Sequence, residues 1–559
     1  MIWFLKMPFH ADSVAHDIIH ADRAPPYDAI VVGSGAAGGV ACHELTQAGL
    51  RVLVLEAGWE PTSSLAGVNA PSARIIASIT NSLRRRSIPP TLNALGMKAL
   101  SAFGRLRQPV QSRCFAWKLS PGSLVDDRDC PYETAPGTRF NWFRSRQVGG
   151  RMVVPGHGRQ YYRMAAADLR GDAHGRPAWP LGLTELEPSY EAVEEKLRLR
   201  GGNDSSRLAP DSLIHTMLAP RPEEAAMISA LQDRLPDLHP ILGRYAPPLD
   251  WIAMAAETGR LTLATGAIVD RVHRDGTGCV TGVGWIDGRS GKRRSAEAPN
   301  VFLCASAFET TRILLMSRDP ADRDGLGMHS DALGRFVMDH AVASCAGQVD
   351  VRKGDETTEA EHGRCLYVPA MAQVDHPATG EVLEGPFGMQ FHRQPIGEHR
   401  ARIDIVGFSP MRPRPENRVT LSPRKDRFGI PVLSIDCRYD DADLAIARHM
   451  LETVEEAARA LHVDIDYLSK EIAPPGTGIH ECGTARMGSD PSTSVVDANG
   501  ECWDTKGLYV TDAAALPSLG VQNPTLTIMA LSARAAAHAS RQRLGRAADP
   551  ERRRVEALT

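Results

Sequence analysis

Short apolar runs and a glycine-rich turn alternate near the front of the chain. Residues 28–32 (DAIVV) form an apolar run of strand length, and residues 33–38 (GSGAAG) follow it directly. A longer apolar stretch then leads to Gly49, and a second short run, 51–55 (RVLVL), ends at Glu56. This order predicts a strand, a tight turn, a helix that ends at Gly49 and a second strand, which together open a parallel α/β sheet.

Later apolar runs predict two further groups of strands. The first group continues the α/β domain, so this domain is assembled from segments that are far apart in the sequence. The second group alternates apolar and polar residues, as the strands of an antiparallel sheet do. The first group has strands at 259–263, 267–273, 280–285 (part of a hairpin) and 300–305, before a helix at 309–316; the second has strands at 346–351, 366–374 and 402–408.

A final strand at 508–512 precedes an Ala-rich apolar run. Asn523 is a good N-cap, Pro524 suits the first helical position, and residues 528–537 contain no helix breaker. We therefore expect a helix that begins at Asn523. Its N-terminus would offer unpaired N–H groups and a partial positive charge to an anionic group, although a buried packing helix has the same pattern.

The glycine-rich turn has the spacing of a dinucleotide-binding site. Gly33 can form the tight turn, Gly35 lets the backbone approach a pyrophosphate, and Gly38 lets the helix pack on the strand. Glu56 follows about 20 residues later, where a carboxylate accepts hydrogen bonds from a ribose hydroxyl and repels a 2′-phosphate. The alternative is a glycine-rich βα turn without a ligand. The residues predicted to bind FAD or NAD here are Gly33, Ser34, Gly35, Ala36, Ala37, Gly38 and Glu56.

Ordered motifs over most of the chain resemble the glucose-methanol-choline (GMC) family of FAD oxidoreductases. The resemblance is weakest over 61–137 and 200–258. It implies an α/β fold in which an FAD-binding Rossmann-like domain is joined to an antiparallel-sheet substrate domain that covers the flavin. The motifs are YDAIVVGSGAAGG (27–39), VLEAG (54–58), QVGGRM (147–152), PNVFLCASAFETTRILLMS (299–317), ALGRFVMDH (332–340), ENRVTLSPRKDRFGIPVLSIDCRY (416–439), HECGTARMGSDPSTSVVD (480–497) and the final strand and helix.

Proline- and glycine-bearing stretches near 61–71, 318–326 and 473–478 mark candidate domain boundaries. Together with the resemblance, they predict an FAD-binding domain made of several segments, a cap or oligomer contact, and a substrate-binding domain. The expected division is an N-terminal arm (1–24), the FAD-binding domain (25–60, 138–170, 225–325 and 476–545), an insertion or cap (61–137), the substrate-binding domain (326–475) and a tail (546–559).

The resemblance also implies how the cofactor is held. Gly149 and Gly150 match a glycine pair beside the flavin, and some members of the family attach FAD covalently to a histidine four residues later. Val154 stands at that position, so non-covalent FAD is predicted. His157, in a segment that looks inserted, is an outside candidate for a linkage or a substrate contact. The other expected cofactor contacts are Val269 at the adenine, Asp512 and Ala513 at the pyrophosphate and ribityl chain, and the helix start at Asn523, Pro524 and Thr525.

Oxidation of an alcohol by hydride transfer requires a base for the hydroxyl proton and a hydrogen bond that orients the oxygen. His480, at the head of HECGTARMG, matches the active-site histidine of the family, and Asn523 matches its second position, which is histidine or asparagine. We predict His480 as general base and Asn523 as donor to the substrate oxygen. His340, in a family-like Met-Asp-His motif, is expected to fix a loop near the dinucleotide.

Four local segments are most similar to the glucoside 3-dehydrogenase and pyranose-oxidising branch of the family: 149–151 (GGR), 158–163 (GRQYYR), 522–524 (QNP) and 529–531 (MAL). Their polar side chains could hydrogen-bond several hydroxyls at once, although an ion-paired loop has the same residues. The expected reaction is oxidation of a secondary ring hydroxyl of a sugar or glycoside to a ketone. The alternatives are a non-sugar alcohol, such as a sterol or a natural-product intermediate, and a flavin-containing lyase or a binding subunit with structural FAD. The candidate substrate residues are Arg159, Gln160, His157 and Gln522.

Composition narrows the class of protein and its location. The chain has 559 residues, 43% of them apolar and 23% charged, as in ordinary proteins of two or three domains. A formal charge of -3 predicts neither nucleic acid nor an anionic membrane as a partner. Ten scattered cysteines predict no metal site and no disulfide framework. No apolar run reaches bilayer length and the first residues do not form a signal peptide, so a cytoplasmic location is expected.

The expected partners are a small alcohol or sugar and an electron acceptor, which is oxygen, a quinone or a cytochrome. No CxxCH haem signature occurs, so any haem belongs to a partner. Some enzymes of this type reach the periplasm with a small subunit that carries the signal, and export of that kind would change the location. A homo-oligomer through 61–137 is a further expectation from the resemblance.

Overall fold

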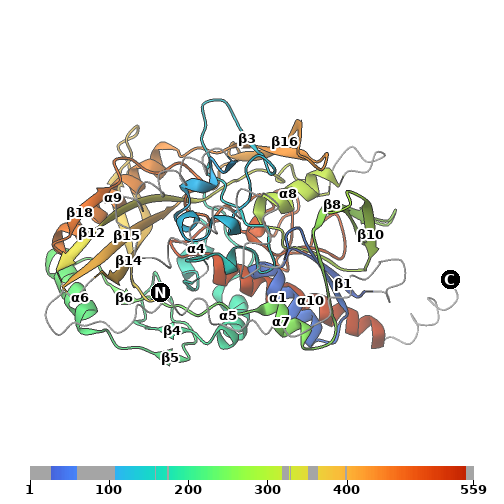
Figure 1. The fold of residues 1–559 in the computed structure, drawn as a ribbon, viewed down its shortest axis with the longest axis horizontal. Coiled ribbons are helices and arrows are strands. Elements are labelled where there is room, and N and C mark those ends of the chain that lie inside the picture. Colours follow the sequence, from blue (N-terminus) through green and yellow to red (C-terminus); the bar gives the residue numbers. More distant parts are fainter. Residues whose placement is uncertain are drawn as a thin grey trace, which may run out of the picture.

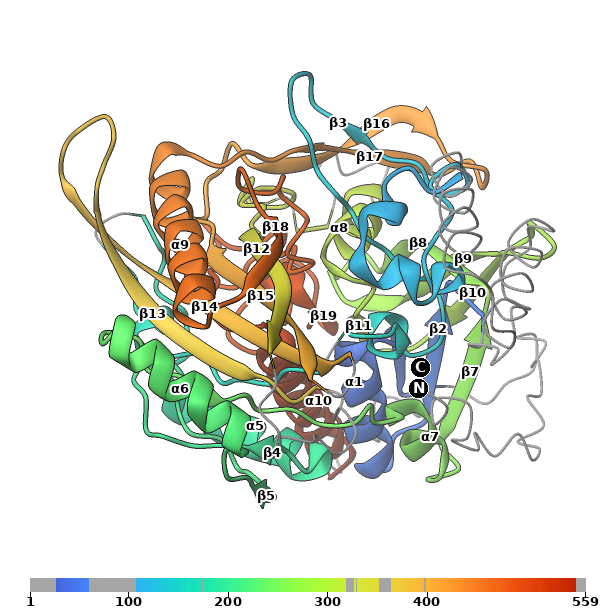
Figure 2. The same cartoon turned by 60° about the vertical axis from the view of Figure 1, so that its left-hand side comes forward.

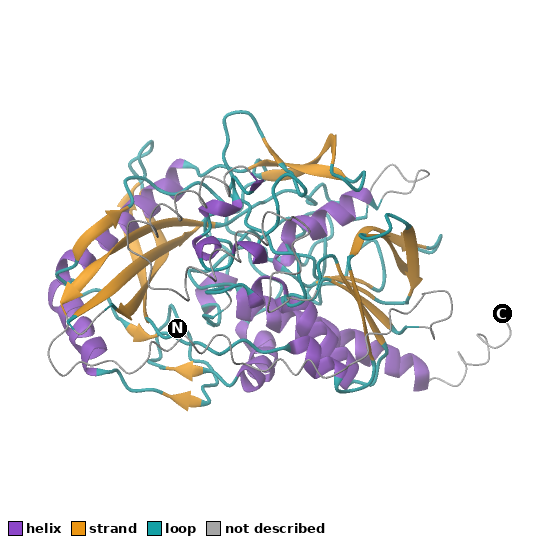
Figure 3. Cartoon of the chain, viewed as in Figure 1, coloured by secondary structure: helices purple, strands orange, loops and turns teal. Residues whose placement is uncertain are grey.

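The computed structural model describes residues 27–59, 107–157, 159–172, 175–317, 326–327, 329–350, 363–396 and 399–548. This part of the chain forms two lobes, each built on one large β-sheet, and loops concentrate between them (Figures 1 and 3). The expected N-terminal arm, most of the expected insertion and nearly all of the expected tail lie outside the described residues. Among the described helices, none combines the length and the apolar character needed to cross a bilayer.

The first lobe contains a five-stranded parallel sheet in the order β19-β11-β1-β2-β7. Its central strands are buried and rich in Val, Ile and Leu, because a parallel sheet is covered on both faces. The sheet confirms the predicted α/β unit and brings together strands from both ends of the described chain. The strands are β1 (Ala29–Val32), β2 (Val52–Glu56), β7 (Leu261–Thr265), β11 (Val301–Leu303) and β19 (Leu508–Val510).

Helices and a small antiparallel sheet flank the parallel sheet. The helix after the glycine-rich turn, α1, packs against α10 and α7, and α10 also packs against α5. The small sheet has the order β10-β9-β8, and α8 packs on β8. The bounds are α1 (Ala36–Gln47), α5 (Leu183–Leu197), α7 (Trp251–Ala256), α8 (Ala307–Met316), α10 (Thr525–Ala548), β8 (Ala267–Arg274), β9 (Val280–Asp287) and β10 (Arg293–Glu297).

The last helix starts two residues later than the sequence predicts. α10 begins at Thr525, and the carbonyl of Pro524 accepts the hydrogen bond from the Ile528 N–H at 2.9 Å. The side chain of Asn523 instead forms hydrogen bonds with Gln390 and His480. Asn523 therefore lies at the entrance to the helix and points its amide towards other elements.

The second lobe contains a six-stranded antiparallel sheet in the order β18-β12-β15-β14-β13-β6. Side chains alternate between its two faces, as the pleat requires. Odd-numbered residues in the middle of β14 and β15, such as Phe387, Met389 and Ile405, join an apolar core with α9 and α6, which cover that face (Figure 2). The bounds are β6 (Ile241–Leu242), β12 (His340–Asp350), β13 (Leu366–Asp375), β14 (Val382–Pro395), β15 (Arg400–Pro410), β18 (Asp464–Leu468), α6 (Pro222–Arg234) and α9 (Asp441–Ala460).

One segment lies in a different lobe from the one expected. Residues 225–325 are predicted from the sequence to belong to the FAD-binding domain, but α6 and β6 belong to the second lobe. β6 pairs with β13, and Met227 and Leu231 of α6 are buried in the core beneath this sheet. This apolar face of α6 can be buried only against a sheet that is distant in sequence, so local periodicity does not reveal its lobe.

Short elements complete the described chain. β3 (Glu133–Thr134) joins β16 (Arg418–Lys425) and β17 (Pro431–Asp436) in a three-stranded sheet, and β4 (Arg200–Gly201) pairs with β5 (Thr216–Met217). The remaining helical segments are α4 (Ala166–Leu169) and the 3₁₀ turns η3 (Gln111–Arg113), η4 (Phe115–Lys118), η5 (Pro121–Ser123), η6 (Gly150–Val153) and η7 (Ala513–Ala515).

Candidate active site

A cavity of about 2400 Å³ lies between the two lobes and is lined by residues of both. Pockets for one small ligand measure roughly 300–1,000 Å³, so this cavity has room for a dinucleotide and a second molecule. Of the site residues predicted from the sequence, Gly38, Gly149 and Gln522 do not line it. Those that do are Gly33, Ser34, Gly35, Ala36, Ala37, Glu56, Gly150, His157, Arg159, Gln160, Val269, His480, Asp512, Ala513, Asn523, Pro524 and Thr525.

Three glycines of the first turn differ in the space around them. Gly33 has φ +95°, and a Cβ there would lie 2.4 Å from the Cys304 carbonyl oxygen. A Cβ on Gly38 would lie 1.9 Å from the Gly33 carbonyl oxygen, so α1 can pack this closely only with glycine. A Cβ on Gly35 would meet no atom within 4 Å. Gly35 therefore presents bare backbone to open space in the cavity, as close approach of a pyrophosphate requires.

Glu56 is held at the end of β2 by three donors. Its Oε2 accepts hydrogen bonds from the Ser34 N–H (3.1 Å) and the Ser34 hydroxyl (2.6 Å), and its Oε1 accepts one from the Gly58 N–H (2.8 Å). Burial raises the pKa of the carboxyl. Because a carboxylate oxygen has two lone pairs, Oε1 keeps one acceptor position for a further hydroxyl. The donor set therefore fits a dinucleotide whose ribose donates a hydrogen bond at this point.

The second glycine pair lies against the first turn. Gly149 donates its N–H to the Ser34 hydroxyl at 3.1 Å, and a Cβ on Gly150 would lie 3.1 Å from the Gly35 Cα. Both glycines have positive φ, 83° and 56°. The two segments, more than a hundred residues apart in sequence, thus form one wall of bare backbone.

The carboxylate of Asp512 binds donors within the protein and not a phosphate. The carboxylate accepts hydrogen bonds from the Ala514 N–H (2.9 Å) and the Thr310 hydroxyl (2.5 Å). Burial raises the pKa of Asp512 to about 6. The side chain fixes the turn η7, so that Asp512 and Ala513 line the cavity at this turn.

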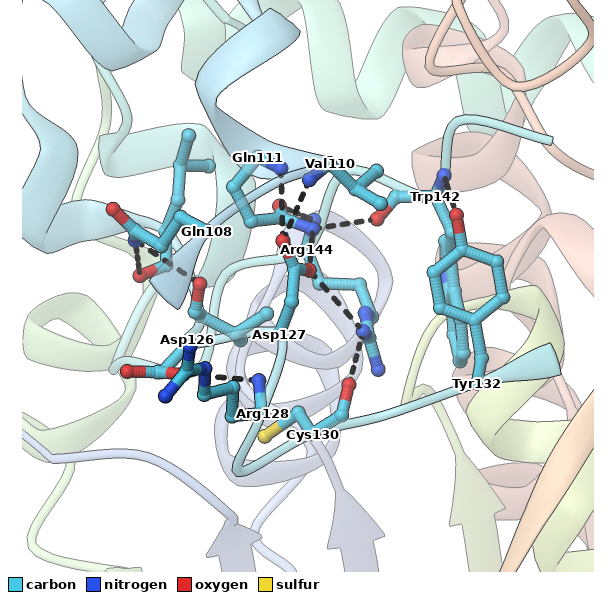
Figure 4. Close-up of polar contacts among 12 residues, drawn as sticks. Gln108, Val110, Gln111, Asp126, Asp127, Arg128, Cys130, Tyr132, Trp142 and Arg144 are labelled. Carbon is cyan, nitrogen blue, oxygen red and sulfur yellow. Dashed lines mark hydrogen bonds and ion pairs between the residues drawn. The ribbon is translucent and has the colours of Figure 1, made fainter. Parts of the chain in front are cut away.

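A polar network holds the loop wall of the cavity in place (Figure 4). The fully buried Gln111 side chain donates to Asp127 (2.8 Å) and to the Trp142 carbonyl (2.9 Å), and it accepts from the Arg144 N–H (2.9 Å). The Arg144 guanidinium lies over the Trp142 ring at 4.0 Å and donates to the Cys130 carbonyl. These contacts join 107–127 to 142–146, and residues of both segments line the cavity.

His480 and Asn523 meet in the same cavity. The Asn523 Nδ2 lies 3.2 Å from the His480 Nε2, although the two residues are 43 positions apart. A substrate oxygen placed between them could accept a hydrogen bond from Asn523 and give its proton to His480. Burial lowers the pKa of His480 well below its ordinary value of 6.5, and the positive charge of Arg151 lowers it further. The imidazole is therefore neutral at neutral pH and free to accept a proton.

His340 lies beside His480 and also contacts the loop that precedes α10. The two Nδ1 atoms are 3.0 Å apart, and the His340 Nε2 lies 2.8 Å from the Gly520 carbonyl oxygen. The Met-Asp-His motif enters β12 at His340, which places this ring under the active-site histidine. The contact spans 140 residues, and no local pattern predicts it.

The carboxylate of Asp339 supports the same histidine by binding its main chain. Its two carboxylate oxygens accept the N–H groups of Gly478 (3.0 Å) and His480 (2.9 Å). Burial and the nearby Glu481 raise the pKa of Asp339 to about 7. Ligand atoms of Asp339, His340 and His480 all lie within 4.8 Å of one another. The two ring nitrogens face each other at hydrogen-bond distance, however, so this group forms a hydrogen-bonded chain in which no position for a metal ion lies between them.

Gln390, on β14, is a site residue that the sequence analysis missed. Its Nε2 donates to the Asn523 Oδ1 at 2.6 Å and so fixes which way the Asn523 amide points. Several even-numbered residues of β14 and β15 line the cavity, including Gln390, His392, Asp404 and Phe408. A prediction of β14 would have provided the signal, because its alternation assigns Gln390 to the face opposite the apolar core.

The four candidate substrate residues have different surroundings. Arg159 lines the cavity and donates to the Met152 carbonyl at 3.2 Å. His157 also lines it, with its Nε2 3.8 Å from the Cys114 Sγ, and burial lowers the pKa of His157 to about 3. Both ends of the Gln160 amide are bound within the protein, by Gly363 and Tyr162, and Gln522 donates to the Leu208 carbonyl. Gln160 and Gln522 therefore hold the fold together in this structure.

Three proteins of known activity are similar to the chain. The 2-methyl-1,2-propanediol dehydrogenase of Mycolicibacterium austroafricanum is 31% identical over 306 residues, which cover 50% of this chain and 54% of that one. The C-glycoside 3-oxidase of Microbacterium trichothecenolyticum is 29% identical over 293 residues, covering 50% and 53%. The paromamine 6'-oxidase of Streptomyces fradiae is 27% identical over 561 residues, covering 95% and 93%. The chain thus matches about half the length of two relatives and nearly all of the third.

A solved structure and two family models are also similar to the chain. The crystal structure of pyridoxine 4-oxidase from Mesorbium loti has a TM-score of 0.55 at 19% identity and covers 92% of this chain and 99% of its own, which shows a similar fold. Residues 31–75 match the NAD(P)-binding Rossmann-like domain, and residues 413–532 match the model described as GMC oxidoreductase. The C-terminal part of the chain is therefore that of a GMC oxidoreductase.

Proposed function

We propose that this protein is an FAD-dependent oxidoreductase that converts a secondary hydroxyl of a sugar or glycoside to a ketone. The observation that carries the proposal is the 3.2 Å contact between His480 Nε2 and Asn523 Nδ2 in the same cavity as the glycine-rich turn. The hydroxyl proton moves to the His480 Nε2, and Asn523 orients the oxygen as the carbonyl forms. Bound FAD would supply, at its N5 atom, the acceptor for the hydride of the carbinol carbon, and so would balance the oxidation.

The proposed cofactor contacts follow the geometry of the cavity. The open backbone at Gly35 and the pair Gly149-Gly150 approach the diphosphate side, and Glu56 binds a ribose hydroxyl. Val154 is fully buried in a separate apolar cluster with Cys114 and Phe143. A valine cannot form a covalent link to flavin, so we propose that FAD is bound non-covalently.

The part of the cavity wall formed by β14 and β15 is consistent with a polyhydroxylated substrate. The cavity-facing residues of β14 and β15 include both donors and acceptors, among them His392 and Asp404, and Phe408 adds an aromatic face. Phe115 and Tyr467, which also line the cavity, are 57% and 56% exposed and so lie where it opens to solvent. Polar groups that converge beside aromatic rings are the usual means of orienting a small polar ligand. The similarity to a protein named C-glycoside 3-oxidase supports the same class.

Anaerobic addition of substrate to the purified protein tests the proposal. We expect glycosides and free hexoses to bleach the flavin absorption faster than simple alcohols do, with a ketone as product. A matched series should be used in which a glycoside is compared with the same compound lacking one ring hydroxyl. Bleaching by simple alcohols alone would contradict the sugar assignment, and a protein that no alcohol bleaches would contradict the oxidoreductase assignment.

Replacing Gln390 with leucine should slow flavin reduction at saturating substrate roughly 10- to 100-fold, because one buried hydrogen bond that orients a site residue is lost. The Asn523 amide then loses its fixed orientation, since its Oδ1 no longer accepts from Gln390. Stopped-flow measurement of the absorbance change gives this rate. Gln373→Leu is the matched control, because Gln373 is exposed on β13 and does not line the cavity. An unchanged rate in Gln390→Leu would show that Asn523 needs no such support.

A further inference from the structure

His340 is a fully buried histidine that joins a main-chain carbonyl to the ring of His480. Its Nε2 lies 2.8 Å from the Gly520 oxygen, and its Nδ1 lies 3.0 Å from the His480 Nδ1. The two rings are almost perpendicular, at 81°, with their centroids 4.9 Å apart. The His340 ring also lies edge-on to Phe408, with the centroids 6.0 Å apart, but His340 does not line the cavity, so any part it has in the reaction is exerted through the residues that it contacts.

The partners of His340 determine the direction of each hydrogen bond. A carbonyl oxygen can only accept, so the His340 Nε2 carries the proton and donates to Gly520. Burial lowers the pKa of His340 to about 4, so the ring is neutral and its Nδ1 has a lone pair. The His480 Nδ1 must then carry the proton that lies between the rings. In the neutral His480, the proton acceptor is therefore Nε2, the atom that faces Asn523.

We propose that His340 is a positioning residue that fixes the tautomer of His480, so that Nε2 is the basic atom and Nδ1–H is bound. This inference rests on the proposed function, because it assigns a means of support to the same base. In the other tautomer Nε2 would carry a hydrogen and could not accept the hydroxyl proton. When His480 is protonated, the neutral His340 continues to accept the Nδ1–H and stabilises the imidazolium without adding a charge.

The other groups around His480 do not replace this contact. Arg151 is paired with Glu481 at 2.9 Å, and both oxygens of Asp339 are bound to main-chain N–H groups. His157 is directed towards Cys114. Among the described residues, the only partner recorded for the His480 Nδ1 is His340. Loss of His340 would therefore leave the tautomer of His480 without a fixed partner.

Two substitutions separate the hydrogen bond from the bulk of the ring. His340→Phe removes the acceptor and keeps a ring of similar size, whereas in His340→Asn the Oδ1 takes the place of the Nδ1 and can still accept. We expect His340→Phe to reduce the flavin roughly 100-fold more slowly at saturating substrate, with little change in KM and with normal FAD content. His340→Asn should be at least about tenfold faster than His340→Phe. His449→Phe is the control, because His449 lies on α9 outside the cavity.

The wild-type protein gives an independent test that needs no activity. Nitrogen NMR of protein with ¹⁵N-labelled histidine rings should show His480 protonated at Nδ1 and unprotonated at Nε2, with the signal assigned from His480→Gln. A proton on Nε2, an unchanged rate in His340→Phe, or equal rates in the two variants at equal FAD content would overturn the inference. A fast His340→Phe beside a slow His480→Ala contradicts only the role of His340. Full activity in His480→Ala contradicts the proposed function itself.

Discussion

Replacing His480 with alanine should slow anaerobic reduction of the flavin by about three orders of magnitude, because a positioned general base contributes roughly 10²- to 10⁴-fold. FAD should stay bound, since the contacts that hold the glycine-rich turn, Glu56 and the second glycine pair do not involve His480. Stopped-flow absorbance at saturating substrate measures the rate, and the flavin spectrum before mixing measures cofactor content.

The pH dependence of the wild-type rate tests the same base. Because the pKa of His480 lies well below 6.5, its basic form persists as the pH falls through that value. The rate of reduction should therefore stay constant from mildly alkaline pH down through 6.5 and decline only in more acidic solution. In His480→Ala this acid limb should disappear. Asn523→Ala should keep it while losing about 10- to 100-fold in rate, because it removes one hydrogen bond to the reacting oxygen.

A His480→Ala variant that reduces as fast as the wild type would exclude His480 as the base. If His480→Ala loses its FAD, the wild-type rate is compared with that of Asn523→Ala instead, because the Asn523 side chain lies beside His480. If both variants kept FAD and full activity, the proton acceptor would have to be another group of the cavity wall.

The parallel sheet could be predicted from the sequence because its information is local. β1 and β2 are continuous apolar runs, the turn between β1 and α1 depends on adjacent glycines, and Glu56 follows directly after β2. Each of these elements is specified within about 30 residues, as in other βαβ units. The same reasoning placed His480 and Asn523 in one site only with the help of the family motif, since neither residue type is distinctive alone.

β14 could not be predicted in the same way, because its interior carries residues that usually interrupt strands. Gly385 and Gly388 read as turn signals, and Pro386 lies between them. Tertiary packing requires these two glycines. A Cβ on Gly385 would lie 3.0 Å from Ile446 of α9, and one on Gly388 would lie 2.9 Å from Val521. The glycines permit close packing on both faces of the sheet. Gln390 was missed because the strand that carries it was missed.

The contacts of the polar residue His340 could not be predicted from the sequence either. Its motif was visible in the sequence, but its function depends on Gly520 and His480, which lie 180 and 140 residues away. Sequence distance hides such contacts, since no periodicity connects them. The lobe of α6 was missed for the same reason, because an amphipathic helix shows which face is buried and not which sheet covers it.

Substitution of Gly35 by alanine should weaken FAD binding roughly 10- to 100-fold and leave the fold intact. The added methyl group meets no protein atom within 4 Å, so it fills only the open space beside the turn, where the diphosphate is proposed to bind. The loss corresponds to about one or two hydrogen bonds to a charged group. Titration of the apoprotein with FAD, followed by flavin fluorescence, measures the affinity, and circular dichroism measures the fold.

Gly38→Ala provides the contrast that makes this result specific. Its methyl group would lie 1.9 Å from the Gly33 carbonyl oxygen, so α1 must move from β1 and the fold itself should be destabilised. Gly35→Ala should therefore give a folded protein that releases its flavin on dilution, and Gly38→Ala an unstable one. Unaltered FAD affinity in Gly35→Ala would show that the diphosphate does not approach this backbone. If neither dilution nor denaturation releases the flavin, it is attached covalently.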